Sequence, residues 1–263
     1  MSKQFSGKTL LVTGSTQGIG LAMTRAFAAE GADVMINGLG DAVAIERTRD
    51  AIERDFGVKA RFHGADMTRR GEIADLVATT EREFGAVDIL INNAGIQHVA
   101  PIEEFPDDKW EAIMAINLSA VFYCTRAALP GMKKRKWGRI INISSVHGLI
   151  GSPNKSAYTA AKHGVVGFTK ALALESAEHG ITANAICPGY VLTELVQKQI
   201  DDQARAHGIS QERAKKEIIL APQAFKEFCR IEDIAAMAVY LASDAARSIT
   251  GSAMSIDGGW TAR

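Results

Sequence analysis

Tyr158 and Lys162 stand four residues apart in the stretch SAYTAAKHGVVGF, which reads as the start of a long helix. At that spacing two side chains lie on the same face of a helix. A phenol with an ordinary pKa of about 10 is a poor base at neutral pH, and a neighbouring ammonium favours the phenolate. The pair is therefore suited to proton transfer. A packing aromatic beside a solvated lysine is the alternative, and the pair alone leaves both open.

A glycine-rich stretch near the N-terminus is suited to binding phosphate. LLVTGSTQGIGLAM places Gly14, Gly18 and Gly20 between a strand-like run and a helical segment. Glycines at such a junction permit a tight turn and let backbone N–H groups and the helix N-terminus approach a pyrophosphate. The spacing is Gly-x-x-x-Gly-x-Gly rather than Gly-x-Gly-x-x-Gly. An ordinary turn rarely needs three glycines there, so the stretch predicts a dinucleotide site.

The end of the second predicted strand bears on which dinucleotide binds. NAD sites often carry an acid at this point, whereas NADP sites need Arg or Lys for the 2′-phosphate. Residues 37–39 are Asn, Gly and Leu, and Thr16 and Gln17 in the glycine loop are also neutral. The absence of a cation favours NAD. Asp66, in HGADM, is placed either to bind an adenine amino group or to cap the next helix.

These residues need a scaffold, and the chain alternates short apolar runs with longer segments of helical period. This alternation predicts an α/β Rossmann-type doubly wound parallel sheet of about seven strands with helices on both faces. With 263 residues and 47% apolar content, we expect a single domain over residues 1–263. A polar helical insertion over about 190–228, between strands six and seven, could cap the site. The seven runs are KTLLVT, DVMING, VKARFHG, VDILINN, GRIINIS, ITANAICP and SAMSIDGG.

Composition excludes several classes of function. Thirty acidic and thirty basic residues balance, so no overall charge favours nucleic acid or an anionic membrane surface. No run approaches the roughly 18 apolar residues of a membrane span, and the N-terminus is too briefly apolar for a signal peptide. The three cysteines are far apart and lack metal-ligand spacing. We expect a soluble cytoplasmic protein without a metal, membrane or nucleic-acid partner.

Four motifs in order resemble the short-chain dehydrogenase/reductase family: TGSTQGIG, INNAG, NISS followed by Tyr158-x-x-x-Lys162, and CPGYVLT. The resemblance covers nearly the whole chain. It implies that Tyr158 donates or accepts the substrate proton, while Lys162 lowers the pKa of Tyr158 and binds the nicotinamide ribose. It further implies that Ser145 holds the substrate oxygen and that Asn117, in AINLS, anchors a water linking Lys162 to solvent.

The same resemblance implies a cofactor site for NAD that spans the ends of several strands. Besides Tyr158 and Lys162, the expected cofactor-binding residues are Gly14, Thr16, Gly18, Ile19, Gly20, Leu39, Asp66, Met67, Asn93, Ala94, Gly95, Pro188, Gly189, Val191 and Thr193.

Further stretches, such as NNAGIQHVAPIEEFP and LVQKQI, are similar to family members that oxidise a four-carbon D-3-hydroxy acid. A desolvated carboxylate needs hydrogen-bond donors and preferably a cation. Tyr190 stands where many of these enzymes have Trp, so the preferred chain length stays open. Gln199, from the insertion, would close over the substrate. The substrate-binding residues implied in this way are Gln97, Ser145, His147, Lys155, Tyr158, Tyr190 and Gln199.

Other functions remain as alternatives. A related reductase could act on a sugar acid or a 3-oxoacyl thioester, although donors at Gln97, His147 and Lys155 would close the pocket to a long acyl chain. A non-catalytic cofactor-binding regulator would be expected to lack the tyrosine or the lysine, and both are present. The resemblance also implies a homotetramer, with the C-terminal GGWTAR near a subunit contact.

Overall fold

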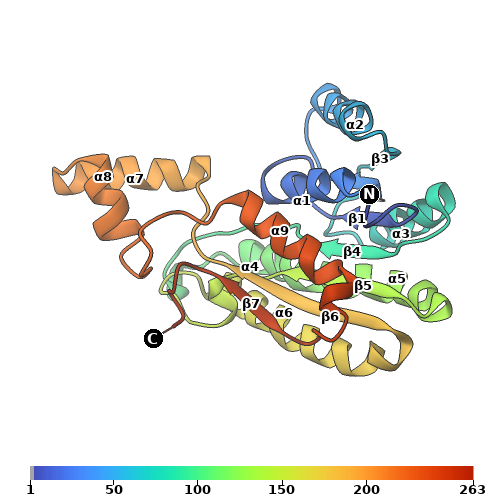
Figure 1. Cartoon of the computed structure of the whole chain (residues 1–263). Helices are drawn as coiled ribbons and strands as arrows, with labels where there is room; N and C mark the ends of the chain where they lie inside the picture. The colour runs from blue at the N-terminus through green and yellow to red at the C-terminus, as the bar shows by residue number, and fades with distance from the viewer. Residues whose placement is uncertain (1–2, 263) are drawn as a thin grey trace.

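Seven parallel strands form one sheet in the order β3-β2-β1-β4-β5-β6-β7 (Figure 1). The computed structural model describes residues 3–262, without the side chains of Glu194 and Leu195. All seven predicted strands are present, so the predicted doubly wound α/β fold is confirmed. Their bounds are β1 Thr9–Val12, β2 Asp33–Asn37, β3 Ala60–His63, β4 Ile89–Asn92, β5 Gly138–Ile143, β6 Ile181–Pro188 and β7 Ala253–Ile256.

Helices cover both faces of the sheet and bury two separate apolar cores. Successive strand residues point to opposite faces, so Leu10 joins one core and Leu11 joins the other. The first core packs α1, α2 and α9 on the sheet, and the second packs α3, α5 and α6 on the opposite face. The helix bounds are α1 Gly18–Ala29, α2 Ala42–Phe56, α3 Arg70–Phe84, α4 Asp107–Met114, α5 Ala120–Arg135, α6 Ser156–Ser176 and α9 Ile231–Ala242.

The order of the strands creates a crevice at the centre of the sheet. The chain builds outward from β1 to β3 and then returns to add β4 on the other side of β1. At such a reversal the loops after neighbouring strands diverge, and ligands bind outside the carboxyl ends of the strands. The glycine loop follows β1 and the INNAG motif follows β4, so both predicted cofactor motifs lie at this point.

A continuous helix runs from Asp107 to Arg135 through α4, the π-helix η2 (Ala115–Ser119) and α5. Among the described residues, it is the one helix long and apolar enough to cross a membrane by length and composition alone. Cys124, Ala128 and Met132 on α5 are nevertheless fully buried in the second core. The core helix of a folded α/β domain meets the same criterion, and these contacts place α5 in that role.

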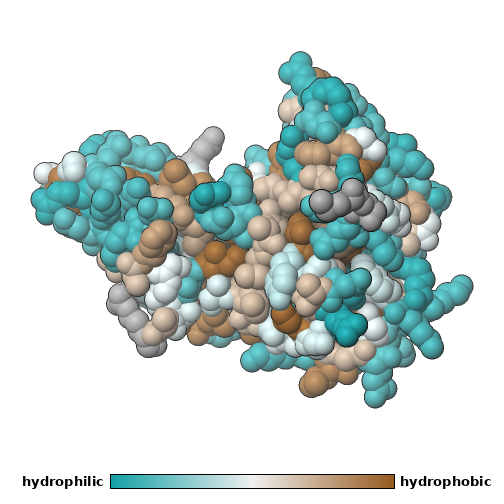
Figure 2. All heavy atoms as spheres, in the orientation of Figure 1, coloured by the Kyte–Doolittle hydropathy of each residue, from teal (hydrophilic) through white to brown (hydrophobic). Residues whose placement is uncertain are grey.

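The stretch between β6 and α9, within the predicted insertion of about 190–228, is helical. It comprises α7 (Glu194–His207), α8 (Gln211–Arg213) and the π-helix η5 (Ala214–Ile219), and it projects from the sheet in Figure 1. Hydrophilic residues cover most of its surface in the view of Figure 2. Its inner side forms a small apolar cluster of its own, which contacts Tyr190 and Phe228 on the body of the protein.

Candidate active site

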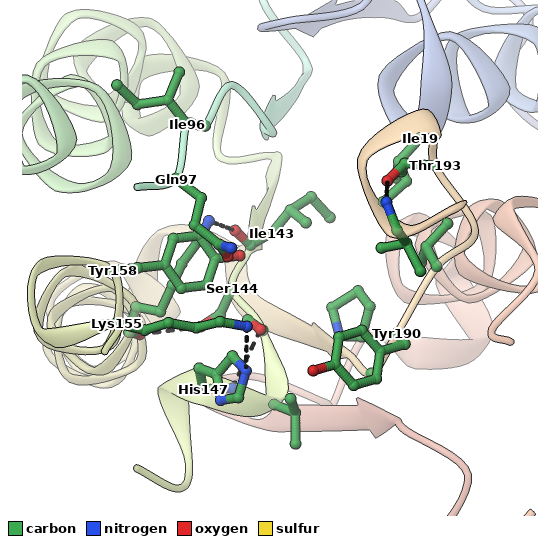
Figure 3. Close-up of a pocket in the computed structure, with 18 of the residues that line it drawn as sticks. Ile19, Ile96, Gln97, Ile143, Ser144, His147, Lys155, Tyr158, Tyr190 and Thr193 are labelled. Atoms are coloured by element: carbon green, nitrogen blue, oxygen red, sulfur yellow. Dashed lines mark hydrogen bonds between the residues drawn. The ribbon is translucent and has the colours of Figure 1, made fainter. Parts of the chain in front are cut away.

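A pocket lies at the carboxyl ends of β4, β5 and β6 (Figure 3). Its walls come from the loops after these strands, the start of α6 and one side of α7. Most of the residues singled out from the sequence meet here. They are Ile19, Asn93, Gly95, Gln97, Ser145, His147, Lys155, Tyr158, Lys162, Pro188, Gly189, Tyr190, Val191, Thr193 and Gln199.

The glycine loop has the geometry of a phosphate cradle. A Cβ atom on Gly14 would lie 2.9 Å from the Cα atom of Ala94, and one on Gly20 would overlap the carbonyl oxygen of Gly14. Gly18 has a φ of +58° and faces open space at the start of α1. Asn93 holds the loop by donating to the carbonyls of Thr13 (3.0 Å) and Gly14 (2.8 Å). The exposed N-terminus of α1 therefore fits a dinucleotide pyrophosphate.

Asn37, at the end of β2, has a structural role. Its Oδ1 atom accepts from the backbone N–H of Gly14 (3.2 Å), and its Nδ2 donates to the carbonyls of His63 and Ala65 (3.0 Å each). The side chain thus ties the ends of three strands together. Leu39, two residues after the buried Asn37, is 67% exposed. An adenosine ribose bound at this strand end would therefore meet an uncharged surface that starts at Leu39. Thr16, from the glycine loop, packs beside Gly38.

Asp66 and Met67, both predicted to contact the cofactor, lie in the loop between β3 and α3. The Asp66 carboxylate accepts from the backbone N–H and the hydroxyl of Thr68, at 2.8 Å each. The N-cap residue of α3 is Arg69, so Asp66 closes the turn before the helix rather than capping it. The Met67 side chain is buried in the second core, which leaves only its backbone to face a cofactor.

A chain of buried amides fixes α6, the helix that carries Tyr158 and Lys162. Asn92 on β4 donates to Asn142 on β5 (2.8 Å), and Asn142 donates to the Thr169 hydroxyl on α6 (2.9 Å). These bonds restrict the two amides and the hydroxyl to one arrangement, and Asn92 Oδ1 alone in this chain of amides has no partner among the described residues. Ser144 adds a second link by donating to the carbonyl of Lys162 at 3.0 Å.

Lys162 does not lower the pKa of Tyr158 in the way that their spacing predicts. Its ammonium donates to the carbonyl of Ile143 at 2.7 Å and lies 5.5 Å from the centre of the Tyr158 ring. Burial raises the pKa of Tyr158, and a hydrogen bond with Ser145 opposes this only in part. Burial also lowers the pKa of Lys162 to about 8. The direction is therefore opposite to the predicted lowering of the tyrosine pKa, and burial of the phenol is its main cause.

Asn117 lies in η2, where the helix widens. Its side chain accepts from the backbone N–H of Ile96 and donates to the carbonyl of Ile96, at 2.9 Å each. A Cβ atom on Gly95 would lie 3.5 Å from Asn117 Oδ1 and 3.7 Å from Lys162 Nζ, so the two side chains meet beside Gly95. These two bonds use one donor and one acceptor site of the Asn117 amide, and they fix its orientation.

A cation and an imidazole converge on the other side of the pocket. Lys155 Nζ lies 3.4 Å from His147 Nε2, and Figure 3 shows Tyr190 across from them. Burial, followed by the charge of Lys155, lowers the pKa of His147 to about 4. Burial lowers the pKa of Lys155 as well. None of the described residues lining the pocket is acidic, and the glutamine side chains of Gln97 and Gln199 complete a surface that suits an anion.

Trp260 is a pocket residue that the sequence did not reveal as one. Its ring lies 5.0 Å from the ring of Tyr190 and 5.4 Å from that of His147, so the C-terminal GGWTAR contributes to the pocket within its own chain. Asp257 holds the turn by accepting from the backbone N–H groups of Gly259 (3.0 Å) and Thr261 (2.9 Å). Pocket residues also missed are Ile96, Ile143, Ser144, Val146 and Val196.

Comparison with known proteins gives consistent matches. The family model described as short chain dehydrogenase matches residues 8–204. D-beta-hydroxybutyrate dehydrogenase from Cupriavidus necator is 53% identical, covering 98% of this chain and 99% of its own. The protein of the same name from Rhizobium meliloti is 52% identical, covering 97% and 99%. A 3-oxoacyl-(acyl-carrier-protein) reductase from Haemophilus influenzae is 38% identical, covering 96% and 98%.

Proposed function

The chain belongs to the short-chain dehydrogenase family and is an oxidoreductase acting on a CH–OH group, and from this premise we propose that it interconverts D-3-hydroxybutyrate and acetoacetate with NAD. The observation that carries the substrate proposal is the pair formed by Lys155 and His147, 3.4 Å apart in the pocket that also contains Tyr158. A short acid can place its carboxylate at this pair and its hydroxyl at the phenol.

In the oxidation, the substrate hydroxyl loses its proton to the oxygen of Tyr158. Ser145 hydrogen-bonds the same substrate oxygen and keeps it beside the phenol. Lys162 lies 5.5 Å from the ring, where its charge would favour the phenolate against the burial that raises the pKa of Tyr158. When bound, the nicotinamide cofactor accepts the hydride from the carbinol carbon. The reduction of the ketone uses the same groups in reverse, with Tyr158 as the acid.

The carboxylate end is held by charge and by donors. Lys155 Nζ and His147 Nε2 are 3.4 Å apart, so the ammonium can donate to Nε2 when that nitrogen carries no proton. A bound carboxylate takes the hydrogen bond of Lys155 and favours the tautomer in which Nε2 donates. Gln97, from the loop after β4, and Gln199, from α7, add amide donors to the pocket lining. Tyr190 and Trp260 then enclose the methyl end of a four-carbon acid.

The cofactor proposal rests on the neutral end of β2 and on the glycine loop. Asn37 is occupied by internal hydrogen bonds, and Leu39 is exposed beside the cradle. Neither offers a cation to a 2′-phosphate, so NAD is favoured over NADP. Thr193 caps α7 by accepting from the backbone N–H of Val196 (3.3 Å), which leaves its hydroxyl proton to donate to the nicotinamide amide.

A related reductase for 3-oxoacyl thioesters is the main competing function. A long acyl chain would have to pass the half-buried Lys155, the buried His147 and the ring of Trp260. A cofactor-binding regulator without turnover is disfavoured because Ser145, Tyr158 and Lys162 line one pocket. We further propose a soluble cytoplasmic homotetramer that serves ketone-body metabolism, with no nucleic acid or membrane as partner.

Initial rates test this proposal directly. The protein with NAD should show NADH absorbance rising with D-3-hydroxybutyrate, and much slower turnover with gluconate or with a 3-hydroxyacyl thioester. A preference for the thioester would move the assignment to the competing reductase. No turnover with any hydroxy acid would support the regulator.

A further inference from the structure

Gln223 is a fully buried amide outside the catalytic motifs, in the segment between η5 and α9. Its Oε1 atom accepts from the backbone N–H of Tyr190 at 3.2 Å. Its Nε2 group donates to the carbonyls of Phe225 (3.2 Å) and Glu227 (2.9 Å). Burying an amide is unfavourable unless it is hydrogen-bonded, so these contacts fix the side chain in one orientation.

The Gln223 amide occupies a narrow passage between the loop after β6 and the turn after β7. A Cβ atom on Gly189 would lie 3.0 Å from Gln223 Oε1, and one on Gly258 would lie 2.8 Å from Gln223 Nε2. The backbone N–H of Phe225 also donates to the carbonyl of Gly258 at 2.9 Å. Gln223 thus joins the loop that carries Tyr190 to the turn that carries Trp260.

Both backbone polar groups of Tyr190 are hydrogen-bonded. Its N–H donates to Gln223, and its carbonyl accepts from the backbone N–H of Cys229 at 2.8 Å. Its ring packs at 5.0 Å against Trp260. The two rings form one side of the pocket that contains Lys155 and His147, and their position therefore sets the space left beyond a carboxylate bound at that pair.

We propose that Gln223 is a positioning residue that fixes the Tyr190–Trp260 wall and thereby selects the chain length of the hydroxy acid. This inference rests on the proposed function, because it takes the carboxylate to lie at Lys155 and His147. Gln223 itself does not line the pocket and touches neither substrate nor cofactor in this arrangement.

Gln223→Met keeps the shape of the side chain and removes its three hydrogen bonds, which leaves the Tyr190 N–H without this partner. Gln211→Met is the matched control, because Gln211 is exposed on α8. For Gln223→Met, we expect KM for D-3-hydroxybutyrate to rise about tenfold, in line with an unpaired buried group, and kcat to change less. The preference for this acid over 3-hydroxypentanoate should shrink, while the dissociation constant for NADH stays within about threefold of wild type.

A second variant tests the same idea if the first fails to fold. In Gln223→Glu, a carboxylate would face the two carbonyls that Nε2 now serves, whereas a protonated carboxyl can donate to one of them. The chain-length preference of this variant should therefore recover toward wild type as the pH falls. Equal losses for both acids and for NADH affinity in either variant would mean a general structural role and would overturn the proposal.

Fluorescence gives a readout that does not depend on the substrate. The emission of Trp260, taken as the difference between each protein and its Trp260→Phe counterpart, should change in Gln223→Met and not in Gln211→Met. Unchanged emission together with unchanged KM would overturn the inference. Absence of 3-hydroxybutyrate turnover in the wild type would instead count against the proposed function, and the emission would still show whether Gln223 holds the wall.

Discussion

The Lys162 ammonium lies 2.7 Å from the carbonyl oxygen of Ile143, the last residue of β5. This bond anchors the lysine to the sheet and directs one of its three N–H groups away from Tyr158. Under the proposed function, the remaining two N–H groups would serve the cofactor ribose and the proton path beside Asn117. The relationship implies that Lys162 acts through its fixed position as well as through its charge.

Substitution should separate the roles of the two residues. Tyr158→Phe should lower kcat by at least about a hundredfold, as expected for loss of an acid–base group, while NADH binding stays nearly intact. Lys162→Met should reduce both turnover and NADH affinity, because one side chain supports both. Steady-state rates and NADH fluorescence titrations measure the two effects. Retention of more than about a hundredth of kcat by Tyr158→Phe would exclude it as the proton-transfer group.

The direction of the reaction should respond to pH in opposite ways. Oxidation needs the phenolate of Tyr158, and burial raises the pKa of this phenol, so kcat/KM for the hydroxy acid should increase with pH through the alkaline range. Reduction needs the protonated phenol and should be faster at lower pH. Profiles measured in both directions check this. An oxidation rate that does not change above neutral pH would show that the phenolate is already formed.

The carboxylate should be recognised by charge. Hydrogen bonds to a charged group are worth about 10- to 150-fold in affinity, so Lys155→Ala should lower kcat/KM for D-3-hydroxybutyrate by about that factor. The loss should shrink to a few-fold on the methyl ester, which carries no anion. His147→Ala should follow the same pattern more weakly. Lys198→Ala, at an exposed position on α7, is the control. Equal losses on acid and ester would make Lys155 structural.

His147 should make the fold sensitive to acid. Its pKa is about 4 in the folded protein and 6.5 in the reference state, so the unfolded chain binds the proton more readily. Stability from this group is therefore complete above the unfolded pKa and is lost as pH falls toward the folded value. Linkage gives a loss of about 2 kcal/mol between pH 7 and pH 5.

Urea unfolding of wild type and His147→Gln at both pH values measures this contribution. The variant should lose less stability than wild type, and His207→Gln, whose histidine is exposed on α7, should behave like wild type. Parallel losses in all three proteins would assign the acid sensitivity to other groups.

Cofactor choice should depend on the surface at Leu39. We expect kcat/KM with NAD to exceed that with NADP by at least about tenfold, because residues 37–39 at the end of β2 are uncharged. Leu39→Arg should raise the value with NADP and change that with NAD little, since this side chain is 67% exposed. Equal use of both cofactors by the wild type would contradict the proposed discrimination.

The sheet could be predicted from the sequence because its strands are buried on both faces. Such strands read as uninterrupted apolar runs, as in TLLV of β1 and GRIINI of β5, and the helical segments between them indicate parallel pairing. The order of the motifs was enough to predict that Ser145, Tyr158 and Lys162 line the pocket. Each of them lies at the carboxyl end of a central strand or at the start of the helix beside it.

Contacts between distant segments could not be predicted in this way. Trp260 reaches His147 only because the turn at Asp257 directs it back over the pocket. Gln223 and Tyr190 are 33 residues apart and have no shared pattern. The pKa of Tyr158 depends on burial that no local spacing reveals. In each case the deciding interaction is tertiary, and residue type alone gives no sign of it.

The passage that holds Gln223 also restricts how this sequence can evolve. Gly189 and Gly258 leave no room for a methyl group beside the amide, and the amide fills space that a smaller residue would leave empty. We therefore expect a change at one of these three positions to disturb the packing unless a change at a second position compensates for it. Among relatives that share the Tyr190–Trp260 wall, the three positions should change together. These joint changes should be found in the relatives that prefer longer hydroxy acids.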